Sequence, residues 1–257
     1  MCVKKALKIF IFHALLCIVV YLRRDNLMMR ISEAFHYASV LGLDYVSFVE
    51  GLAEAYGYTE SKRLRGDIVT WSFFVRILRS IIKDLKEVSE YESTLKLEAM
   101  QSQLRSLSAE PILSDCLGLP EVYWIKSKLE QKGISVHVEF YINKKGLTTS
   151  FKKVFREETM ADVARQYEGY LFNIIDHNLH EYLEKEPLEL EILIQKMNQY
   201  LKPTAERIAD YMANIHKNLL ADHGYDIVFQ NNGYIVTHGN PQFLGLSRLS
   251  PLLIVQP

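Results

Sequence analysis

The sequence predicts a mostly helical α+β protein, with a helical N-terminal domain and two β-hairpins in its C-terminal region. Glycine and proline are scarce, with 12 and 7 residues among 257, and this scarcity favours long helices over a loop-rich β fold. Apolar residues recur at helical spacing through much of the chain. Alternating apolar residues flank turn residues in two places, residues 134–155 and 226–238, and this pattern predicts the hairpins.

The composition is that of an ordinary globular protein. Hydrophobic residues make up 49% and charged residues 24%, and these values exclude global disorder. The net charge is -1, so the chain has no overall positive electrostatic field of the kind that attracts nucleic acid. The cysteines form neither a disulfide framework nor a CxxC metal site, which favours a reducing compartment. They are Cys2, Cys17 and Cys116.

An apolar segment, residues 9–22, lies between basic residues near the start of the chain. Its length of about 14 residues is below the roughly 18–20 that span a bilayer comfortably, and no small-x-small cleavage site follows it. Three interpretations remain for residues 1–28: a short signal anchor, a buried or interfacial helix, and a non-native extension, with Met28 or Met29 as the true start. We expect a cytoplasmic protein, with residues 9–22 as its membrane anchor under the first interpretation.

Residues 29–110 are expected to form the helical domain. Helical spacing predicts helices near residues 31–43 and 44–56, followed by a longer segment without glycine or proline between Gly66 and Pro111. Apolar residues of this segment follow the a/d spacing of a coiled-coil seam. They are Trp71, Phe74, Leu78, Ile81, Leu85 and Val88. The segment is interpreted either as the central helix of the domain or as a helix for dimerisation or signal transmission.

Proline and glycine residues mark the start of a second domain, residues 111–257. Its predicted elements are a helix at 121–132, strands at 134–142 and 147–155, helices at 159–185, 188–201 and 203–221, strands at 226–230 and 234–238, and an apolar tail at 241–257. Turn residues 143–146 and 231–233 join each pair of strands into a hairpin. The tail is expected to lie extended on the core or to pair at a sheet edge.

Charge is distributed unevenly over this second domain. Residues 121–156 carry eight Lys or Arg against three acidic residues, and residues 157–201 carry three basic against ten acidic residues. One interpretation is a solvated dipolar surface, or two blocks that pack together. The other is a basic helix and hairpin that contact nucleic-acid phosphates. The contacting residues would be Lys126, Lys144, Lys145, Lys152, Lys153 and Arg156.

The sequence offers weak signals for chemistry. It contains no GxSxG, Walker, GxGxxG or HExxH motif. His177 and His180 stand three apart on a predicted helix, but no other His/Cys cluster supplies further metal ligands. Asp222, His223 and His238 lie near one another in the sequence without a nucleophile paired to a clear base. We therefore predict no catalytic residue, no metal and no cofactor, and favour an interaction protein over an enzyme.

Residues 171–237 resemble a winged helix-turn-helix. Predicted helices at 188–199 and 203–221 follow an acidic break at 184–187, and Gly224 leads into the hairpin that would be the wing. In this family the third helix reads DNA and the wing contacts phosphate. Here that helix carries Glu206 and Asp210 beside Arg207 and Lys217, and the wing has no basic residue. The resemblance therefore implies a protein-contact unit. Its contact surface would comprise Tyr225, Phe229 and Tyr234.

A second set of residues is similar to the ATP-binding domain of sensor histidine kinases of the GHKL type. Residues 128–138 look like a strand at the start of that domain, and Asn173 matches a magnesium-binding asparagine. His177 stands where the family has a second asparagine, so the resemblance implies a degenerate ATPase. The glycine-containing stretches 231–233 and 243–247 resemble its later motifs. Helical periodicity over residues 188–220, where that family has strands, argues against this resemblance.

Together these observations favour a regulatory or scaffolding interaction protein with winged-helix-like units. The expected partners are another protein or a second copy of this chain, with nucleic acid contacted through the basic residues of 120–156. The alternative is a membrane-anchored signalling protein with a degenerate ATP-binding domain of the histidine-kinase type.

Overall fold

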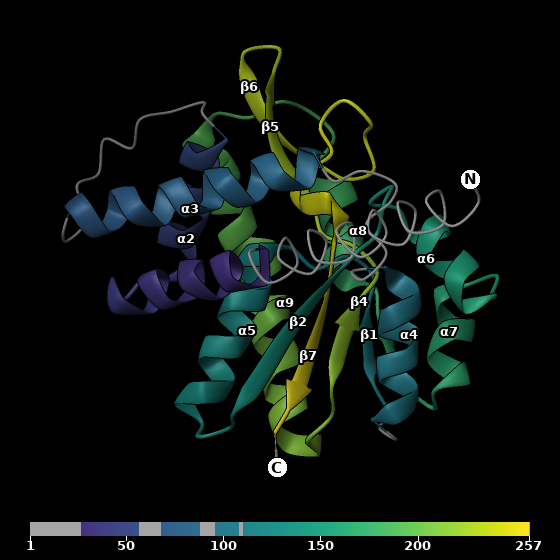
Figure 1. Ribbon diagram of the computed structural model, residues 1–257. Coiled ribbons are helices and arrows are strands. Elements are labelled where there is room, and N and C mark those ends of the chain that lie inside the picture. Colours follow the sequence, from purple (N-terminus) through teal and green to yellow (C-terminus); the bar gives the residue numbers. More distant parts are fainter. Residues whose placement is uncertain (1–26, 57–67, 88–95, 108–109, 257) are drawn as a thin grey trace, which may run out of the picture.

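In the computed structural model of the protein, the strands of a central sheet lie between two groups of helices (Figure 1). The structure describes residues 27–56, 68–87, 96–107 and 110–256. Helices predominate in these ranges, which confirms the expected α+β, mostly helical class. The apolar segment 9–22 and the expectation of an anchor lie outside the described residues. Among the described residues, no helix combines the length and the apolar character needed to cross a membrane.

The helices that precede the sheet are one over residues 27–40, α2 (Tyr45–Ala55) and α3 (Ile68–Glu87). The Asp44 carboxylate begins α2 by accepting a hydrogen bond from the Ser47 backbone N–H at 2.7 Å. The apolar positions predicted along α3 are buried, except that Val88 lies outside the described residues. These helices share one apolar core with α5 (Leu119–Gln131) and α9 (Leu190–Ile215), so α3 is a core helix of this chain.

The sheet has five strands in the order β2-β7-β4-β1-β3. Their bounds are Val136–Ile142 (β2), Leu249–Val255 (β7), Leu219–Ala221 (β4), Ile112–Ser114 (β1) and Tyr170–Phe172 (β3). β1 runs parallel to β3 and β4, whereas β7 runs antiparallel to β2 and β4. The carboxyl ends of β1, β3 and β4 therefore lie at one edge of the sheet, where ligand sites of α/β sheets form.

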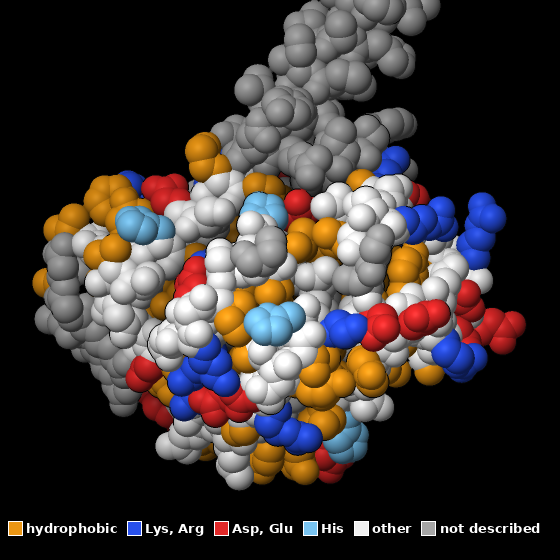
Figure 2. Space-filling model, turned by 90° about the horizontal axis from the view of Figure 1, so that it is seen from below, with side chains coloured by type: hydrophobic (Ala, Val, Ile, Leu, Met, Phe, Trp, Pro, Cys, Tyr) orange, Lys and Arg blue, Asp and Glu red, His pale blue; other side chains and the backbone are white. Residues whose placement is uncertain are grey.

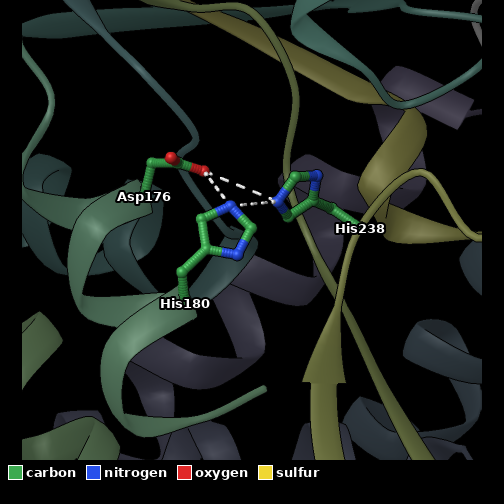
Figure 3. A group of neighbouring side chains, drawn as sticks. All are labelled: Asp176, His180 and His238. Carbon is green, nitrogen blue, oxygen red and sulfur yellow. Dashed lines mark hydrogen bonds and ion pairs between the residues drawn. The ribbon is translucent and has the colours of Figure 1, made fainter. Parts of the chain in front are cut away.

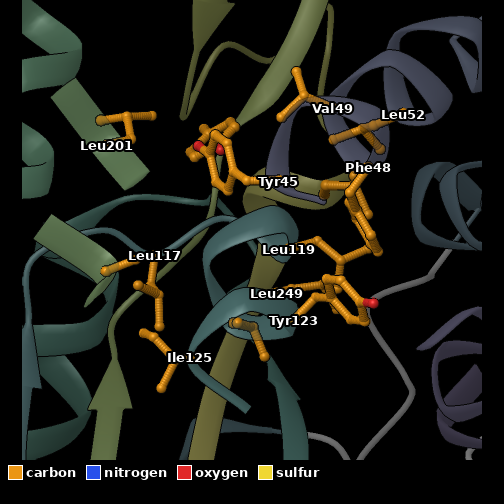
Figure 4. Close-up of a cluster of buried hydrophobic side chains, with 14 of the residues drawn as sticks. Tyr45, Phe48, Val49, Leu52, Leu117, Leu119, Tyr123, Ile125, Leu201 and Leu249 are labelled. Atoms are coloured by element: carbon orange, nitrogen blue, oxygen red, sulfur yellow. The ribbon is translucent and has the colours of Figure 1, made fainter. Parts of the chain in front are cut away.

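Both faces of the sheet are covered, because neighbouring residues of a strand point to opposite faces. Residues facing the core shared with α5 and α9 are Ile112, Leu219 and Leu253, and their neighbours facing the second core are Leu113, Leu220 and Leu252. The second core lies under α4 (Leu97–Ser106), α6 (Thr148–Phe155) and α7 (Met160–Gln166). In the first core, Phe48 of α2 stacks on Tyr123 of α5 with ring centroids 4.7 Å apart (Figure 4).

The first predicted hairpin is wrong in its second half. The strand over residues 134–142 is confirmed as β2, but residues 147–155, expected as its partner, form the helix α6. Gly146 has a φ of 58°, and the chain turns there into the helix. The strand beside β2 is instead β7, from the apolar tail. The tail is extended as expected, although it lies inside the sheet between β2 and β4 and not at an edge.

The predicted break before Pro203 is also wrong. Residues expected as two helices, 188–201 and 203–221, form the single helix α9, with Pro203 inside it. The Thr204 hydroxyl donates to the Tyr200 carbonyl at 3.1 Å, next to the position where proline lacks an N–H. The helix ends at His216, whose φ is 49°, and residues 219–221 become the buried strand β4. One helix therefore stands where the winged-helix resemblance implies two.

The second predicted hairpin is confirmed. It consists of β5 (Asp226–Gln230) and β6 (Gly233–Thr237), which extend to the top of Figure 1. Asn231 and Asn232 have positive φ angles of 50° and 61°, as tight two-residue hairpin turns require. The hairpin continues directly from the loop after β4, and its second strand leads back to the same sheet edge.

At the opposite end of the molecule, the residues that the structure describes show no segregation of charge. Figure 2 views the face at the amino ends of the parallel strands, where basic and acidic side chains lie beside one another among apolar ones. Such a mixed surface is typical of a solvated face. At the other end of the molecule, aspartate and histidine side chains gather at the carboxyl edge of β1, β3 and β4.

Candidate metal centre

Six aspartate and histidine side chains meet at the carboxyl edge of the parallel strands. Each belongs to a segment that follows a strand of the sheet or hairpin. Asp115 follows β1, α8 (Ile174–Tyr182) follows β3 and carries Asp176 and His180, Asp222 and His223 follow β4, and His238 follows β6. They form two groups, which we name the outer cluster (Asp176, His180, His238) and the inner cluster (Asp115, Asp222, His223).

The outer cluster places three ligand atoms at the corners of a nearly equilateral triangle (Figure 3). The Asp176 Oδ1 atom lies 3.4 Å from His180 Nε2 and 3.5 Å from His238 Nε2, and the two Nε2 atoms lie 3.4 Å apart. Ligand atoms bound about 2.05 Å from a tetrahedral ion lie about 3.3–3.4 Å from one another. The triangle thus has the dimensions of one face of a tetrahedral site.

Neighbouring groups orient the imidazole of His180 for this role. Its Nδ1 atom lies 2.6 Å from Glu184 Oε2, so the Nδ1 proton is donated to the carboxylate and Nε2 keeps its lone pair. A histidine that binds a metal commonly donates its other ring N–H to a carboxylate or a carbonyl. Glu184 Oε1 also lies 3.8 Å from His238 Nε2, so this carboxylate faces both imidazoles of the cluster.

The inner cluster is largely buried: Asp222 and His223 are fully buried, whereas Asp115 is half-buried. Asp222 Oδ1 accepts hydrogen bonds from the backbone N–H groups of Cys116 at 2.9 Å and His223 at 3.0 Å. Asp222 Oδ2 makes no hydrogen bond among the described residues and lies 3.3 Å from His223 Nε2. His223 Nδ1 lies 2.9 Å from the Gly224 carbonyl, which leaves Nε2 pointing at the carboxylates. A buried carboxylate oxygen of this kind requires a proton or a cation.

The hydroxyl of Thr148 lies within the inner cluster. Its Oγ1 atom is 3.3 Å from Asp115 Oδ1 and 3.2 Å from His223 Nε2. Thr148 is the first residue of α6, and the N-terminal end of a helix carries a partial positive charge and unpaired N–H groups. A hydroxyl between ligand groups, at a position that attracts anions, is suited to attack an anionic substrate.

The two clusters are adjacent. The rings of His223 and His238 stack with centroids 4.5 Å apart. Burial, followed by the charges of Asp222 and Asp176, raises the pKa of Asp115 to about 7. Burial likewise raises the pKa of Asp222 to about 7 and lowers the pKa of His223 and of His238. Neutral imidazoles beside crowded carboxyl groups can bind a cation, which would then replace the carboxyl protons.

Backbone contacts hold the loops of the inner cluster together. The Leu117 N–H donates to the His223 carbonyl at 2.8 Å, which joins the loop after β1 to the loop after β4. The buried amide of Asn143 donates to the carbonyl of Asp222 at 2.8 Å and to that of Leu147 at 2.9 Å. The segment that delivers Thr148 is thereby tied to the segment that delivers Asp222.

Of the six basic residues predicted to contact nucleic acid, the fold separates one from the other five. Lys126 lies on α5 and pairs with Glu130 on the same helix. Lys144 and Lys145 stand in the loop before α6. Lys152 and Lys153 belong to α6, and Arg156 follows its last residue. Five of the six predicted residues therefore lie on the segment that carries Thr148.

The predicted contact surface is largely buried. Tyr225 is 1% exposed and donates its hydroxyl to the buried carboxylate of Glu121. Tyr234 is 5% exposed, so neither tyrosine can form a contact surface in this state. Phe229 is 40% exposed and contacts Tyr234 edge-on, at a centroid distance of 5.1 Å.

The sequence contained part of the signal for this site. The fold does not bring His177 to the metal-ligating group of His180; Asp176 lies beside His180 there instead. Asp176 and His180 stand four apart, the spacing that aligns side chains on one helix face. Their partner His238 is 58 residues from His180. Asp222 is 106 residues from Cys116, whose backbone N–H donates a hydrogen bond to its carboxylate. Only the fold reveals such neighbours.

No protein-family model matches the chain, and no curated protein is similar to it. The evidence for function is therefore the geometry of the site. The winged-helix and histidine-kinase resemblances, and the interaction partners that they imply, stay predictions.

Proposed function

We propose that this protein is a metal-dependent enzyme that hydrolyses phosphate esters, with Thr148 as its nucleophile. The observation that carries the proposal is the position of the Thr148 hydroxyl, 3.3 Å from Asp115 and 3.2 Å from His223, beside two neighbouring clusters of metal-ligating groups. Paired metal sites are common in enzymes that displace phosphoryl groups, where the ions stabilise the charge on the attacking and leaving oxygens.

The ligand set favours a transition metal such as Zn²⁺ or Mn²⁺. Each cluster contains imidazole nitrogen together with carboxylate oxygen, whereas Mg²⁺ and Ca²⁺ prefer oxygen alone. His180 and His238 would hold one ion with Asp176, and His223 would hold the other with Asp115 and Asp222.

The protein groups can carry out a balanced displacement. Thr148 Oγ1 forms a bond to phosphorus as the bond to the leaving oxygen breaks, and the leaving alcohol takes a proton from solvent. The Thr148 proton passes to the Asp115 carboxylate, 3.3 Å away. Water then attacks the phosphothreonine, and Thr148 recovers a proton from Asp115. The N-terminal end of α6 stabilises the transferred anion throughout.

The proposal is tested with p-nitrophenyl phosphate, bis-p-nitrophenyl phosphate and p-nitrophenyl sulfate, on protein loaded with Zn²⁺ or Mn²⁺. We expect hydrolysis of at least one phosphate ester, loss of activity with a chelator, and recovery on readdition of metal. Thr148→Ala should lower kcat/KM by roughly 10³-fold or more, and Thr148→Ser should retain much of the activity.

The neighbouring Thr149→Ala is the matched control, because this exposed residue is on the same helix but belongs to neither cluster. If Thr148→Ala were as active as the control, Thr148 would not be the nucleophile. Hydrolysis of the sulfate ester alone would change the substrate class, and absence of any metal-dependent hydrolysis would overturn the proposal.

A further inference from the structure

The exposed face of α6 is basic and begins beside the proposed nucleophile. Thr149, Lys152, Lys153 and Arg156 have the spacing i, i+3, i+4 and i+7, which places them along one side of a helix. The opposite side, with Phe151 and Phe155, is buried in the second core. The basic residues therefore point away from the sheet.

The charges of this face are not used for folding. Among the described residues, no ion pair joins Lys152, Lys153 or Arg156 to an acidic group, whereas Lys126 and Lys132 of α5 are both paired. Lys153 and Arg156 are exposed and Lys152 is half-buried. Unpaired cations on one helical face repel one another, so the arrangement is suited to an anionic partner.

A hollow of about 590 Å³ continues the face at the far end of α6. Lys153 and Arg156 line it together with Arg105 of α4, and the side chains of Gln101 and Gln166 add hydrogen-bonding groups. Two acidic residues, Glu98 and Glu157, also line the hollow, so it is basic by one charge. Amide and guanidinium groups of this kind bind phosphate and the polar edges of bases.

The dimensions fit a chain of phosphates. At about 1.5 Å per residue, Lys152 and Lys153 lie about 6–8 Å from Thr148 along the helix axis, and Arg156 about 12 Å from it. A nucleic-acid strand carries one charge per about 3.4 Å of helix axis, and more widely spaced charges when it is extended. The basic face is thus long enough to contact roughly two to three further phosphates beyond the one at Thr148.

We propose that the substrate is a nucleic-acid strand, whose scissile phosphodiester lies at Thr148 while the adjoining phosphates lie along Lys152, Lys153 and Arg156. This inference rests on the proposed function. It assigns the cleaved bond to a phosphodiester, and it gives α6 two tasks: its N-terminal end holds the reacting phosphate, and its exposed face holds the flanking ones.

The test uses the full chain loaded with Zn²⁺ or Mn²⁺ and two substrates, bis-p-nitrophenyl phosphate and a single-stranded oligonucleotide of about a dozen nucleotides. Lys152→Glu/Lys153→Glu is compared with Lys83→Glu/Lys86→Glu on α3, which changes the net charge equally at exposed positions. We expect the α6 variant to hydrolyse the small diester within about twofold of the unaltered protein. Its kcat/KM for the oligonucleotide should fall at least tenfold, mainly through KM.

The salt dependence gives a second readout. Each phosphate contact on a single strand contributes a slope of about -0.7 to the plot of log affinity against log salt, so the α6 variant should lose a slope of about 1.4 in oligonucleotide binding measured by fluorescence anisotropy. The α3 variant should keep the original slope.

The outcomes separate this inference from the proposed function. If the small diester is hydrolysed and the oligonucleotide is not, or if both variants affect the oligonucleotide equally, the inference is overturned and the proposed function stands. If no ester is hydrolysed, the proposed function fails, and the anisotropy comparison then decides whether the α6 face binds a nucleic-acid strand at all. If the two variants bind the oligonucleotide with equal affinity, the strand does not bind along α6, whatever rate of hydrolysis is measured.

Discussion

The inner and outer clusters use the same ligand types but are built differently. In the inner cluster, Asp222 and His223 are fully buried, and backbone N–H and C=O groups orient both side chains. In the outer cluster, the side chain of His180 is 52% exposed and is oriented by another side chain, Glu184. One site is thus fixed by the main chain of neighbouring loops, and the other by contacts that can rearrange.

This difference has an energetic consequence. Burial holds the pKa of the inner carboxyl groups near 7, so the inner cluster binds protons tightly when no cation is present. The outer cluster is closer to solvent, since the side chain of His180 is 52% exposed. We expect the inner cluster to bind metal with high selectivity and strong pH dependence, and the outer cluster to exchange its ion more readily.

The largest effect is expected for Asp222→Asn, which keeps the volume of the side chain and removes its charge. The inner cluster should lose its ion, and the metal-dependent kcat/KM should fall by roughly 10³-fold or more. Metal content by mass spectrometry and esterase kinetics measure the two effects. Asp210→Asn, at an exposed position on α9, is the control. An unchanged metal content in Asp222→Asn would show that the inner cluster does not bind the ion.

A smaller and reversible effect is expected for His180→Ala. The outer ion should bind about 10²-fold more weakly, because one of three ligands is lost, and added Zn²⁺ should restore part of the activity. His177→Ala is the matched control, since His177 stands on the same helix outside the cluster. Titration of activity with metal distinguishes the two. Equal metal requirements for both variants would contradict the assignment of His180 as a ligand.

A still smaller effect is expected for Glu184→Gln. The variant can accept the Nδ1 hydrogen bond of His180 through its amide oxygen but no longer carries the charge that makes the imidazole a stronger ligand. Metal affinity at the outer cluster should decline by about tenfold, at the lower end of the range for such neighbours. Isothermal titration calorimetry with Zn²⁺ provides the measurement. An affinity change confined to the inner cluster would show that the two clusters are not independent.

The smallest effect is on the stability of the metal-free protein. A carboxyl group whose pKa is raised on folding stabilises the folded state below its unfolded pKa, and this stabilisation is lost as pH rises through about 7. The buried histidines, with lowered pKa values, act in the opposite sense, but only as pH falls below their ordinary pKa of about 6.5. The Tm of the metal-free protein should therefore decrease from pH 6.5 to 8.

Metal should remove this decrease, and Asp222→Asn should reduce it without metal, because one of the two titrating carboxyl groups is gone. Thermal unfolding followed by circular dichroism, with and without a chelator, checks both statements. A metal-free Tm that rises over this pH range would contradict the raised pKa values.

Local patterns predicted the elements whose partners are near in the sequence. The hairpin of β5 and β6 was predicted because Asn231 and Asn232 tolerate the positive φ of a tight turn. The buried face of α3 followed from helical spacing. By contrast, Thr148 and Thr149 suggested a strand, since threonine is common in strands. Burial of Phe151 and Phe155 against the second core decides in favour of a helix.

The candidate site was harder to predict because its ligands are distant in the sequence. The spacing of Asp176 and His180 was visible, but a pair of ligands on one helix does not make a site. β4 precedes Asp222 and His223, and its three residues are too few for a periodic signal, so the sequence pattern places them in the preceding helix. Parallel strands require long crossover connections, so their adjacent ends belong to residues far apart in the chain.

The amino-acid sequence by itself determined the helical class, the strand β2, the second hairpin and the cluster of basic residues between 144 and 156, because each depends on contacts between near neighbours. Only the tertiary structure decided that the apolar tail enters the sheet, that residues 190–215 are one helix, and that six distant ligand groups share one edge. The reason is physical: strand pairing and burial are interactions between distant segments, and their free energy exceeds the local preferences of a few residues.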